Sequence, residues 1–292
     1  MWQFVEFWIW ALVALAIAIY ATLAIVARRR GFRLREARLA RARLAARRHT
    51  KYPIVLAHGW FGFDAVALPG LRQEYFRGVR AALEDHGNEV LVPKVSPVAS
   101  IKRRAEQLSD QLSRYDVDRV NIVAHSMGGL DARYAITHLG MAPRVASLTT
   151  FGTPHRGTPL ADRGLLLGDD SWVRKMLSMT GPDMDGLRDL TVRRMEAFNE
   201  SVPDVPSVTY MSYLGWVEPG AGAVNRLLQP GYRFLNRCAG HNDGLVPASS
   251  QRWGDVLGSA QADHWAQIGW SRGLDAPAFY LGLVQTLARS GF

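Results

Sequence analysis

The sequence predicts an α/β fold with a mostly parallel, doubly wound sheet, preceded by one transmembrane helix. Three observations lead to this prediction. After residue 51, short apolar runs alternate with helical patterns, as they do in parallel βαβ units. Within 120–129, a serine with small neighbours stands between such a run and such a pattern. Near the start, the 21 residues from Phe7 to Ala27 carry no charge.

The uncharged segment has the length of a membrane anchor. As a helix it would span about 32 Å, close to the roughly 30 Å hydrocarbon core of a bilayer. Trp2, Trp8 and Trp10 gather at one end, where amphipathic rings favour the membrane boundary. A cleaved signal peptide would need a basic start and a shorter apolar run. A buried helix of a soluble core would seldom be so uniformly apolar. We therefore expect an uncleaved single-pass anchor at residues 1–27.

The formal net charge of +9 is concentrated in one segment. Residues 28–51 hold eleven basic residues and one acid, whereas residues 52–292 hold 24 of each. The neutral remainder argues against a nucleic-acid-binding face. The Arg-rich segment is expected to continue as a helix, which is a solvated linker, a segment bound to anionic lipid headgroups, or both. The positive-inside rule then places the following domain on the cytoplasmic side.

Residues 52–292 contain the predicted elements of the sheet in order. The predicted strands are 54–57, 88–95, 119–124, 145–151 and 207–212. The predicted helices run from a Ser100 cap to about 115, over 128–139, and from Pro277 to about 290. The interval 155–204 interrupts this rhythm and is rich in Gly, Asp, Leu and Met. We expect it to form a mostly helical cap, although core packing would explain its Met and Leu residues equally well.

The strongest chemical signal is Ser126, which follows the apolar run 120–124 and precedes the helical pattern at Gly128. A nucleophilic serine on a sharp strand-to-helix turn needs small residues two positions before and after it. Ala124 and Gly128 meet this requirement. The helix that follows favours negative charge developing at its N-terminus. This pattern predicts that Ser126 is a catalytic nucleophile.

A serine hydroxyl is a weak nucleophile and needs a base, which an acid in turn orients. In this arrangement the chain order is serine, acid, histidine. The histidines after Ser126 are His138, His155, His241 and His264. His264 comes shortly before the last predicted helix, where such a fold places its base, and we predict that it is the base.

Asp243 is predicted to be the orienting acid, because it lies in the loop-like segment 242–247. Asp255 and Asp263 are rival candidates for this role. Asp263 adjoins His264 in sequence, so we expect its side chain to point elsewhere. Acyl transfer also needs donors aimed at the oxyanion. We predict the backbone N–H of Met127, which follows the nucleophile, and that of Trp60, which follows the first strand.

Five segments together resemble the true lipases of bacteria, the family I triacylglycerol lipases of the α/β-hydrolase superfamily. They are 52–64, the Ala-His-Ser-Met-Gly-Gly segment 124–129, the Thr-Pro-His-Arg-Gly segment 153–157, the Asn-Asp-Gly-Leu-Val-Pro segment 242–247, and Asp263-His264. They occur in the family's order. The resemblance implies acyl-ester hydrolysis by Ser126, Asp243 and His264, with Trp60 and Met127 at the oxyanion hole.

The sequence also departs from this family. Many members bind a structural calcium ion, and two of the implied ligand positions are Gln229 and Ala266 here. Calcium prefers carboxylate oxygens, so we expect no metal and no other cofactor. Many members carry a disulfide, which the single cysteine, Cys238, cannot form; we expect it to be a free buried thiol. Members that are secreted have a cleaved signal peptide, whereas this chain has a predicted anchor.

The function predicted from these features is that of a membrane-anchored serine lipase or esterase that acts on acyl esters, most naturally lipids. A phospholipase A or lysophospholipase with the same mechanism is the first alternative, and acyl transfer to an alcohol would use the same residues. A non-catalytic, membrane-tethered binding module is the alternative from another class. The expected location is the bacterial inner membrane, with the charge rule favouring the cytoplasmic side and secreted relatives the periplasmic side. The anchor and the apolar cap are compatible with a homodimer.

Overall fold

The computed structural model describes residues 49–59, 74–166, 185–220 and 224–292. The chain divides into two compact units, Met1–Arg47 and Arg48–Phe292, and all of the described residues belong to the second. The predicted anchor, nearly all of the Arg-rich segment, and Trp60 lie outside the described residues. Within the described residues, no helix is both long and apolar enough to cross a bilayer.

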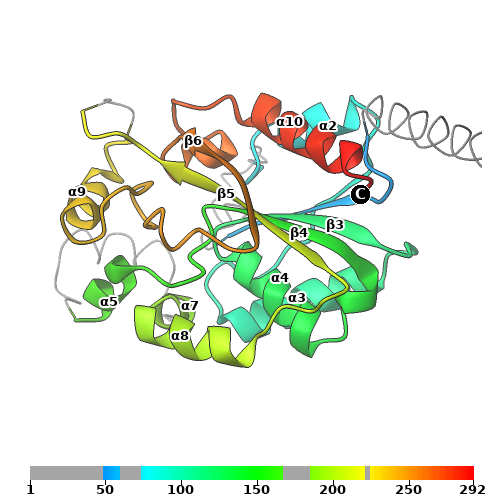
Figure 1. Cartoon of the computed structure of the whole chain (residues 1–292), viewed down its shortest axis with the longest axis horizontal. Coiled ribbons are helices and arrows are strands. Elements are labelled where there is room, and N and C mark those ends of the chain that lie inside the picture. Colours follow the sequence, from blue (N-terminus) through cyan, green and yellow to red (C-terminus); the bar gives the residue numbers. More distant parts are fainter. Residues whose placement is uncertain (1–48, 60–73, 167–184, 221–223) are drawn as a thin grey trace, which may run out of the picture. The chain divides into compact units, whose positions relative to one another are not determined.

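In the described part of the chain, six parallel strands form one sheet (Figure 1). They are β1 (Ile54–Ala57), β2 (Val90–Leu91), β3 (Val120–His125), β4 (Val145–Phe151), β5 (Thr209–Trp216) and β6 (Asp255–Gln261). Their order is β2-β1-β3-β4-β5-β6, so the direction of strand addition reverses between β1 and β3. Ligand sites of open α/β sheets lie beyond the carboxyl ends of the strands at such a reversal.

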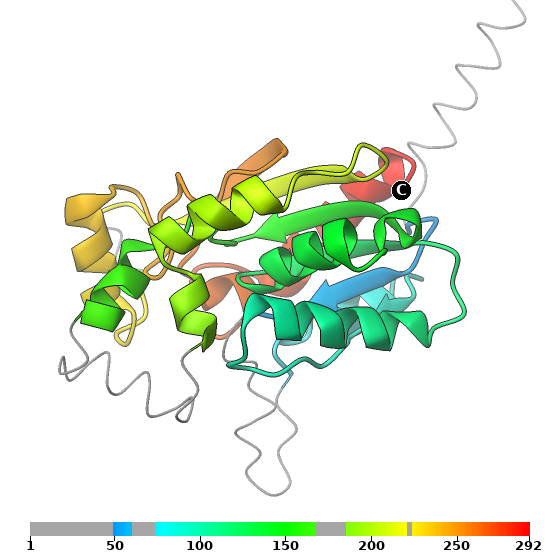
Figure 2. The same ribbon diagram turned by 90° about the horizontal axis from the view of Figure 1, so that it is seen from below.

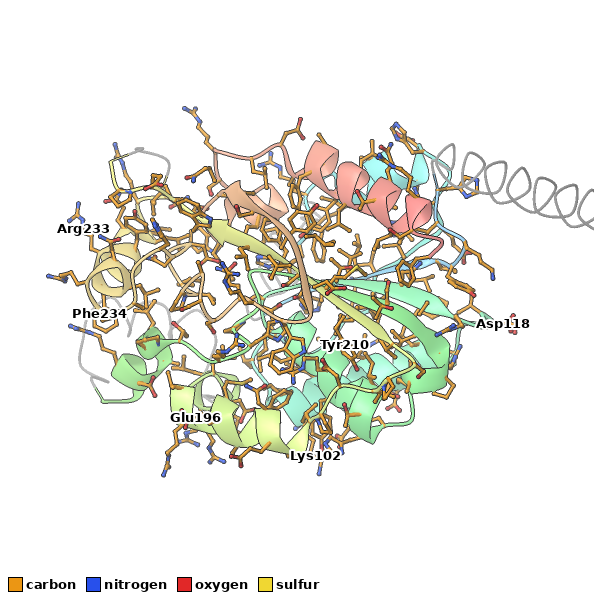
Figure 3. The ribbon with its side chains drawn as sticks, in the orientation of Figure 1. Lys102, Asp118, Glu196, Tyr210, Arg233 and Phe234 are labelled. Atoms are coloured by element: carbon orange, nitrogen blue, oxygen red, sulfur yellow. The ribbon has the colours of Figure 1, made fainter. Side chains whose placement is uncertain are left out.

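Helices cover both faces of this sheet (Figure 1). One face carries α3 (Ile101–Ser113) and α4 (Gly128–His138), and the other carries α2 (Val79–Glu84) and α10 (Ala276–Arg289). Every residue of β1, β3 and β4 is buried, as expected for strands with helices on both sides. Each face has its own apolar cluster, and Tyr210 of β5 packs into the one beneath α3 and α4 (Figure 3).

Most of the remaining helices lie towards the carboxyl ends of the strands (Figure 2). Between β4 and β5 the described residues form α5 (Pro159–Leu166), α7 (Asp185–Asp189) and α8 (Val192–Ser201). After β5 comes α9 (Gln229–Cys238), which lies beside α5. The Arg163 guanidinium of α5 stands 4.9 Å from the ring centre of Phe234, labelled on α9 in Figure 3. Two short 3₁₀ helices, η2 (Ala142–Arg144) and η3 (Ala266–Ile268), complete the described elements.

The structure corrects several sequence predictions. The predicted strand 88–95 is reduced to Val90–Leu91, because the Asn88 side chain bonds the Thr50 N–H and Leu83 carbonyl and Pro93 has no N–H to donate. β5 extends beyond the predicted end at 212, and β6 was not predicted. Cys238 is exposed rather than buried, because it ends α9 a turn beyond Leu235, the last α9 side chain to reach the core.

A buried ion pair joins α3 to α4 beneath the turn that follows β1. The Arg104 guanidinium lies 2.7 Å from the Asp131 carboxylate and donates to the carbonyls of Ser96 and His58. Both side chains are almost fully buried. Burial raises the pKa of Asp131 to about 6, while Arg104 opposes this shift. The pair therefore holds the His58 carbonyl, at the end of β1, in a fixed position.

We predict that Arg104→Met destabilises the protein by about 3–5 kcal/mol, because it leaves Asp131 buried without a partner. The double variant Arg104→Met, Asp131→Leu should cost less than the sum of the two single changes. Urea denaturation midpoints measure these costs. The matched control is Arg80→Met, which removes the exposed pair to Glu84 and should cost below about 1 kcal/mol. Additive costs at positions 104 and 131 would contradict this coupling.

Candidate active site

Ser126 lies on the turn between β3 and α4 with φ of 54°, in the left-handed region. No other non-glycine residue of the described chain has a positive φ. Such a conformation costs on the order of 1–3 kcal/mol and persists only when its surroundings hold it. Here the Ser126 N–H donates to the Phe151 carbonyl (3.0 Å), and the Ser126 carbonyl accepts from the Thr153 hydroxyl (2.7 Å). The backbone of the predicted nucleophile is thus fixed by β4 and the turn that follows it.

The glycines around this turn are required by close approach. A Cβ on Gly128 would stand 2.5 Å from the Ala57 carbonyl oxygen, so only glycine lets α4 begin against the end of β1. A Cβ on Gly59 would stand 2.5 Å from the Ser126 Cβ. The steric requirement predicted for Gly128 is therefore present, and Gly59 adds a second contact of the same kind.

The three residues predicted as a triad are brought together from separate loops. His264 Nε2 lies 3.0 Å from Ser126 Oγ, and His264 Nδ1 lies 2.7 Å from Asp243 Oδ2. All three side chains are nearly or fully buried. An ionised carboxylate can only accept, so Nδ1 carries the proton of the neutral imidazole, and Nε2 offers its lone pair to the serine hydroxyl. This is the hydrogen-bond direction that a general base requires.

Asp243 is held by donors on both of its oxygens. Oδ1 accepts from the backbone N–H groups of Leu245 and Val246, at 3.0 and 2.8 Å. Oδ2 accepts from the side-chain amides of Gln267 and Gln251, at 2.9 and 3.3 Å, in addition to His264. The backbone N–H of His264 also donates to the backbone carbonyl of Asp243, at 2.8 Å. The carboxylate therefore has little freedom to turn away from the imidazole.

The rival acids have other places in the structure. Asp255 is exposed at the start of β6. The buried Asp263 carboxylate accepts from the N–H groups of Trp265, Ala266 and Asn225 and from the Ser271 hydroxyl. As expected from its place next to His264, its contacts lie away from that ring. Asp263 instead ties the loop carrying His264 to the chain before α9.

The other candidate histidines lie outside the triad. His138 Nε2 donates to the Ser201 carbonyl, and exposed His241 contacts the Trp216 ring. His155 is buried and stacks on Trp253, and burial lowers its pKa well below the usual value, helped by Arg133. Arg133 stacks on the same Trp253 and donates to Asn199 of α8, and the Asn199 amide donates to the His155 carbonyl. His155 therefore belongs to the packing against α8.

Of the two predicted oxyanion donors, the structure describes only Met127. Met127 is buried and immediately precedes α4, where backbone N–H groups point out of the helix end. Its N–H donates to no acceptor among the described residues. The Trp60 position lies outside them, but its neighbour Gly59 lies against Ser126.

Three residues that lie behind the predicted triad were not predicted from the sequence. Tyr75, His125 and Gln267 form a hydrogen-bonded chain that ends on Asp243. His125 directly precedes Ser126 and Gln267 follows His264 by three positions, but nothing in their local pattern distinguishes them from core residues. Only the folded contacts reveal this chain.

The two positions that the resemblance links to calcium are occupied by Gln229 and Ala266. The Gln229 amide donates to the Val224 carbonyl and accepts from Arg233, and Ala266 has no side-chain oxygen. The described residues contain no group of three or more His, Cys, Asp or Glu side chains placed to hold a metal.

The chain is similar to known proteins in sequence and in fold. The model of the PGAP1-like alpha/beta domain matches residues 95–176. Triacylglycerol lipase 2 of Saccharomyces cerevisiae is 32% identical over 255 residues, covering 76% of this chain and 76% of the yeast protein. The triacylglycerol lipase of Pseudomonas fragi is 30% identical over 256 residues, covering 72% and 85%. The crystal structure of the mature Bacillus licheniformis lipase BlEst2 has a TM-score of 0.64 at 24% identity, covering 80% and 92%.

We predict that Gly59→Ala lowers kcat/KM at least about 10²-fold, because the added Cβ displaces the Ser126 side chain or the turn after β1. The matched control is Gly282→Ala in α10, where a Cβ meets nothing within 4 Å. That change should leave activity unaltered and raise stability by about 0.5–1 kcal/mol. Ester hydrolysis and thermal unfolding measure both effects. Full activity in Gly59→Ala would contradict this prediction, because the turn after β1 would then have room for a Cβ at position 59.

Proposed function

This chain belongs to the triacylglycerol lipase family of α/β-hydrolases, and on that basis we propose that it cleaves acyl esters of lipids through Ser126, His264 and Asp243. It is a carboxylic ester hydrolase. The observation that carries the assignment of residues is the continuous contact from Asp243 through His264 to a serine held in a left-handed turn. Lipid substrates are supported by the names of the relatives, which are triacylglycerol lipases.

In the proposed mechanism, Ser126 Oγ attacks the carbonyl carbon of the ester while its proton passes to His264 Nε2. Asp243 holds the imidazole in place and stabilises the imidazolium that forms. The N–H groups of Met127 and Trp60 bind the oxyanion. His264 then gives the proton to the leaving alcohol oxygen as the carbon–oxygen bond breaks. Water, deprotonated by His264, attacks the acyl-enzyme and releases the fatty acid and free Ser126.

The burial of the site supports this mechanism. Asp243 is fully buried and His264 is only 5% exposed, so the charge pair that forms during acylation is poorly screened by water. The imidazole ring of His125 lies 4.5 Å from that of His264. Burial lowers the pKa of His125 well below its usual value, and the neighbouring His264 lowers it further. A neutral His125 places no second positive charge beside the imidazolium.

Ser126→Ala is predicted to lower kcat on p-nitrophenyl esters by about 10⁴–10⁶-fold. Ser113→Ala, at an exposed helix end, is the matched control and should retain full activity. Wild-type activity should extend to long acyl chains in detergent and persist in EDTA, because we propose that no metal takes part. Full activity in Ser126→Ala would refute the mechanism, and cleavage of short chains alone would refute the lipid assignment. Release of fatty acid from phosphatidylcholine but not from triacylglycerol would favour the phospholipase alternative.

We also propose that residues 1–27 anchor the enzyme in a bilayer and that residues 28–51 bind anionic headgroups. The support is the 21-residue uncharged segment followed by eleven basic residues. The full chain should therefore stay with bacterial membranes through alkaline carbonate washing and be released by detergent. Release by carbonate would contradict the anchor.

Protease added to spheroplasts should spare a cytoplasmic catalytic domain and digest a periplasmic one.

A further inference from the structure

Behind the proposed triad, one side chain joins the acid to two groups that the mechanism does not use. Gln267 Nε2 lies 2.9 Å from Asp243 Oδ2, and Gln267 Oε1 lies 3.1 Å from His125 Nε2. On the other side of its ring, His125 Nδ1 lies 2.7 Å from the Tyr75 hydroxyl. Gln267 and His125 are fully buried. A single hydrogen-bonded chain therefore runs from the acid to Tyr75.

The direction of every proton in this chain follows from Asp243. An ionised carboxylate only accepts, so the amide of Gln267 must turn its N–H₂ to Asp243 and its oxygen to His125. His125 then donates from Nε2, and as a neutral ring it accepts at Nδ1, so Tyr75 donates its hydroxyl proton. The lowered pKa of His125 agrees with a neutral ring.

The chain ends beside the nucleophile. A Cβ on Gly59 would stand 2.8 Å from the Tyr75 hydroxyl oxygen and 3.0 Å from Ser126 Oγ. Burial raises the pKa of Tyr75, and a hydrogen bond with the Gly59 backbone opposes this. The Tyr75 hydroxyl donates its proton to His125. Towards the turn after β1, the Tyr75 oxygen can therefore act only as an acceptor. The acid loop and the oxyanion side of the site are therefore connected through protein groups.

Two neighbouring residues lack side chains where the Gln267 amide lies. A Cβ on Gly152 would stand 2.1 Å from its oxygen, and a Cβ on Gly215 would stand 2.0 Å from its nitrogen. Gly152 also has a φ of 63°, which independently favours glycine. Gly215 lies within β5, where glycine weakens a strand and often marks the close approach of another group. The close approach of the Gln267 amide explains why position 215 has no side chain.

We propose that Gln267 is a positioning residue of the hydrolase, which holds Asp243 against His264 and fixes His125 and Tyr75 in one hydrogen-bond direction. This role rests on the proposed function of Ser126, Asp243 and His264. Gln267 touches neither the substrate nor the reacting atoms. Its effect passes through the acid on one side and the turn after β1 on the other.

The test compares Gln267→Leu and Gln267→Glu with wild type in steady-state ester hydrolysis across pH. Leu removes both hydrogen bonds at similar volume, and we expect kcat to fall about 10–10²-fold with KM within about twofold. A Glu side chain can make both hydrogen bonds, donating to Asp243 and accepting from His125, only while its carboxyl group is protonated. As pH rises, a second carboxylate beside Asp243 breaks the donor bond and repels the acid. Gln267→Glu should therefore lose kcat on the alkaline side, where wild type does not.

Gly215→Ala provides a variant that leaves Gln267 itself intact. The Cβ added at position 215 should displace the Gln267 amide and reproduce the fall in kcat. In the double variant Gly215→Ala, Gln267→Ala, kcat should fall little further than in Gln267→Ala, because the space that the amide occupied is then empty. Gln285→Leu, a half-buried change on α10, is the matched control and should keep wild-type kcat and pH profile.

The outcomes separate this role from the proposed function. If Ser126→Ala is inactive while both Gln267 variants retain the wild-type kcat and pH profile, the positioning role is overturned and the triad stands. If Gln267→Leu is less stable yet has unchanged kcat, the residue is structural only and the role is again overturned. If Ser126→Ala remains fully active, the proposed function and the positioning role fall together.

Discussion

A serine in the left-handed region can persist between a strand and a helix only where neighbouring backbone holds it and neighbouring side chains leave room. At Ser126 the backbone is held by the Phe151 carbonyl and the Thr153 hydroxyl, and Gly59 and Gly128 leave the room. Phe151 ends β4 and Thr153 follows it, Gly59 follows β1, and Gly128 follows β3. The position of Ser126 thus depends on the register of β1, β3 and β4, and a shift in any of them would close the turn.

Buried carboxylates organise the loops around this turn. Asp243 gathers donors from its own loop, from Gln267 and Gln251, and from His264. Asp131 holds Arg104, which holds the His58 carbonyl. Asp263 ties the His264 loop to the chain before α9. Burying a charge is costly unless donors surround it, so these carboxylates specify loop positions that apolar packing would leave less defined.

The elements predicted best from the sequence are those whose signal is local. Ile54–Ala57 and Val145–Phe151 are apolar runs buried on both faces, and both strands were predicted with the observed bounds. The Ser100 cap was also predicted, and its hydroxyl accepts from the Arg103 N–H. The edge strand β6 was missed, because all of its residues are exposed or only half-buried and they form no apolar run. The juxtaposition of Ser126, Asp243 and His264 could be anticipated because chain order and loop type restrict the choice. The contacts of Arg104 and Gln267 could not, because a buried arginine or glutamine has no periodic signature.

The central claim is that Ser126 is activated by its neighbours, and covalent labelling tests it most directly. An alkyl fluorophosphonate reacts with a serine only where a base takes its proton. After labelling of the catalytically active full chain and proteolysis, mass spectrometry should find the phosphonyl group on the peptide carrying Ser126, with loss of ester hydrolysis in proportion. Labelling of a different serine, or full labelling of Ser126 without loss of activity, would contradict the account.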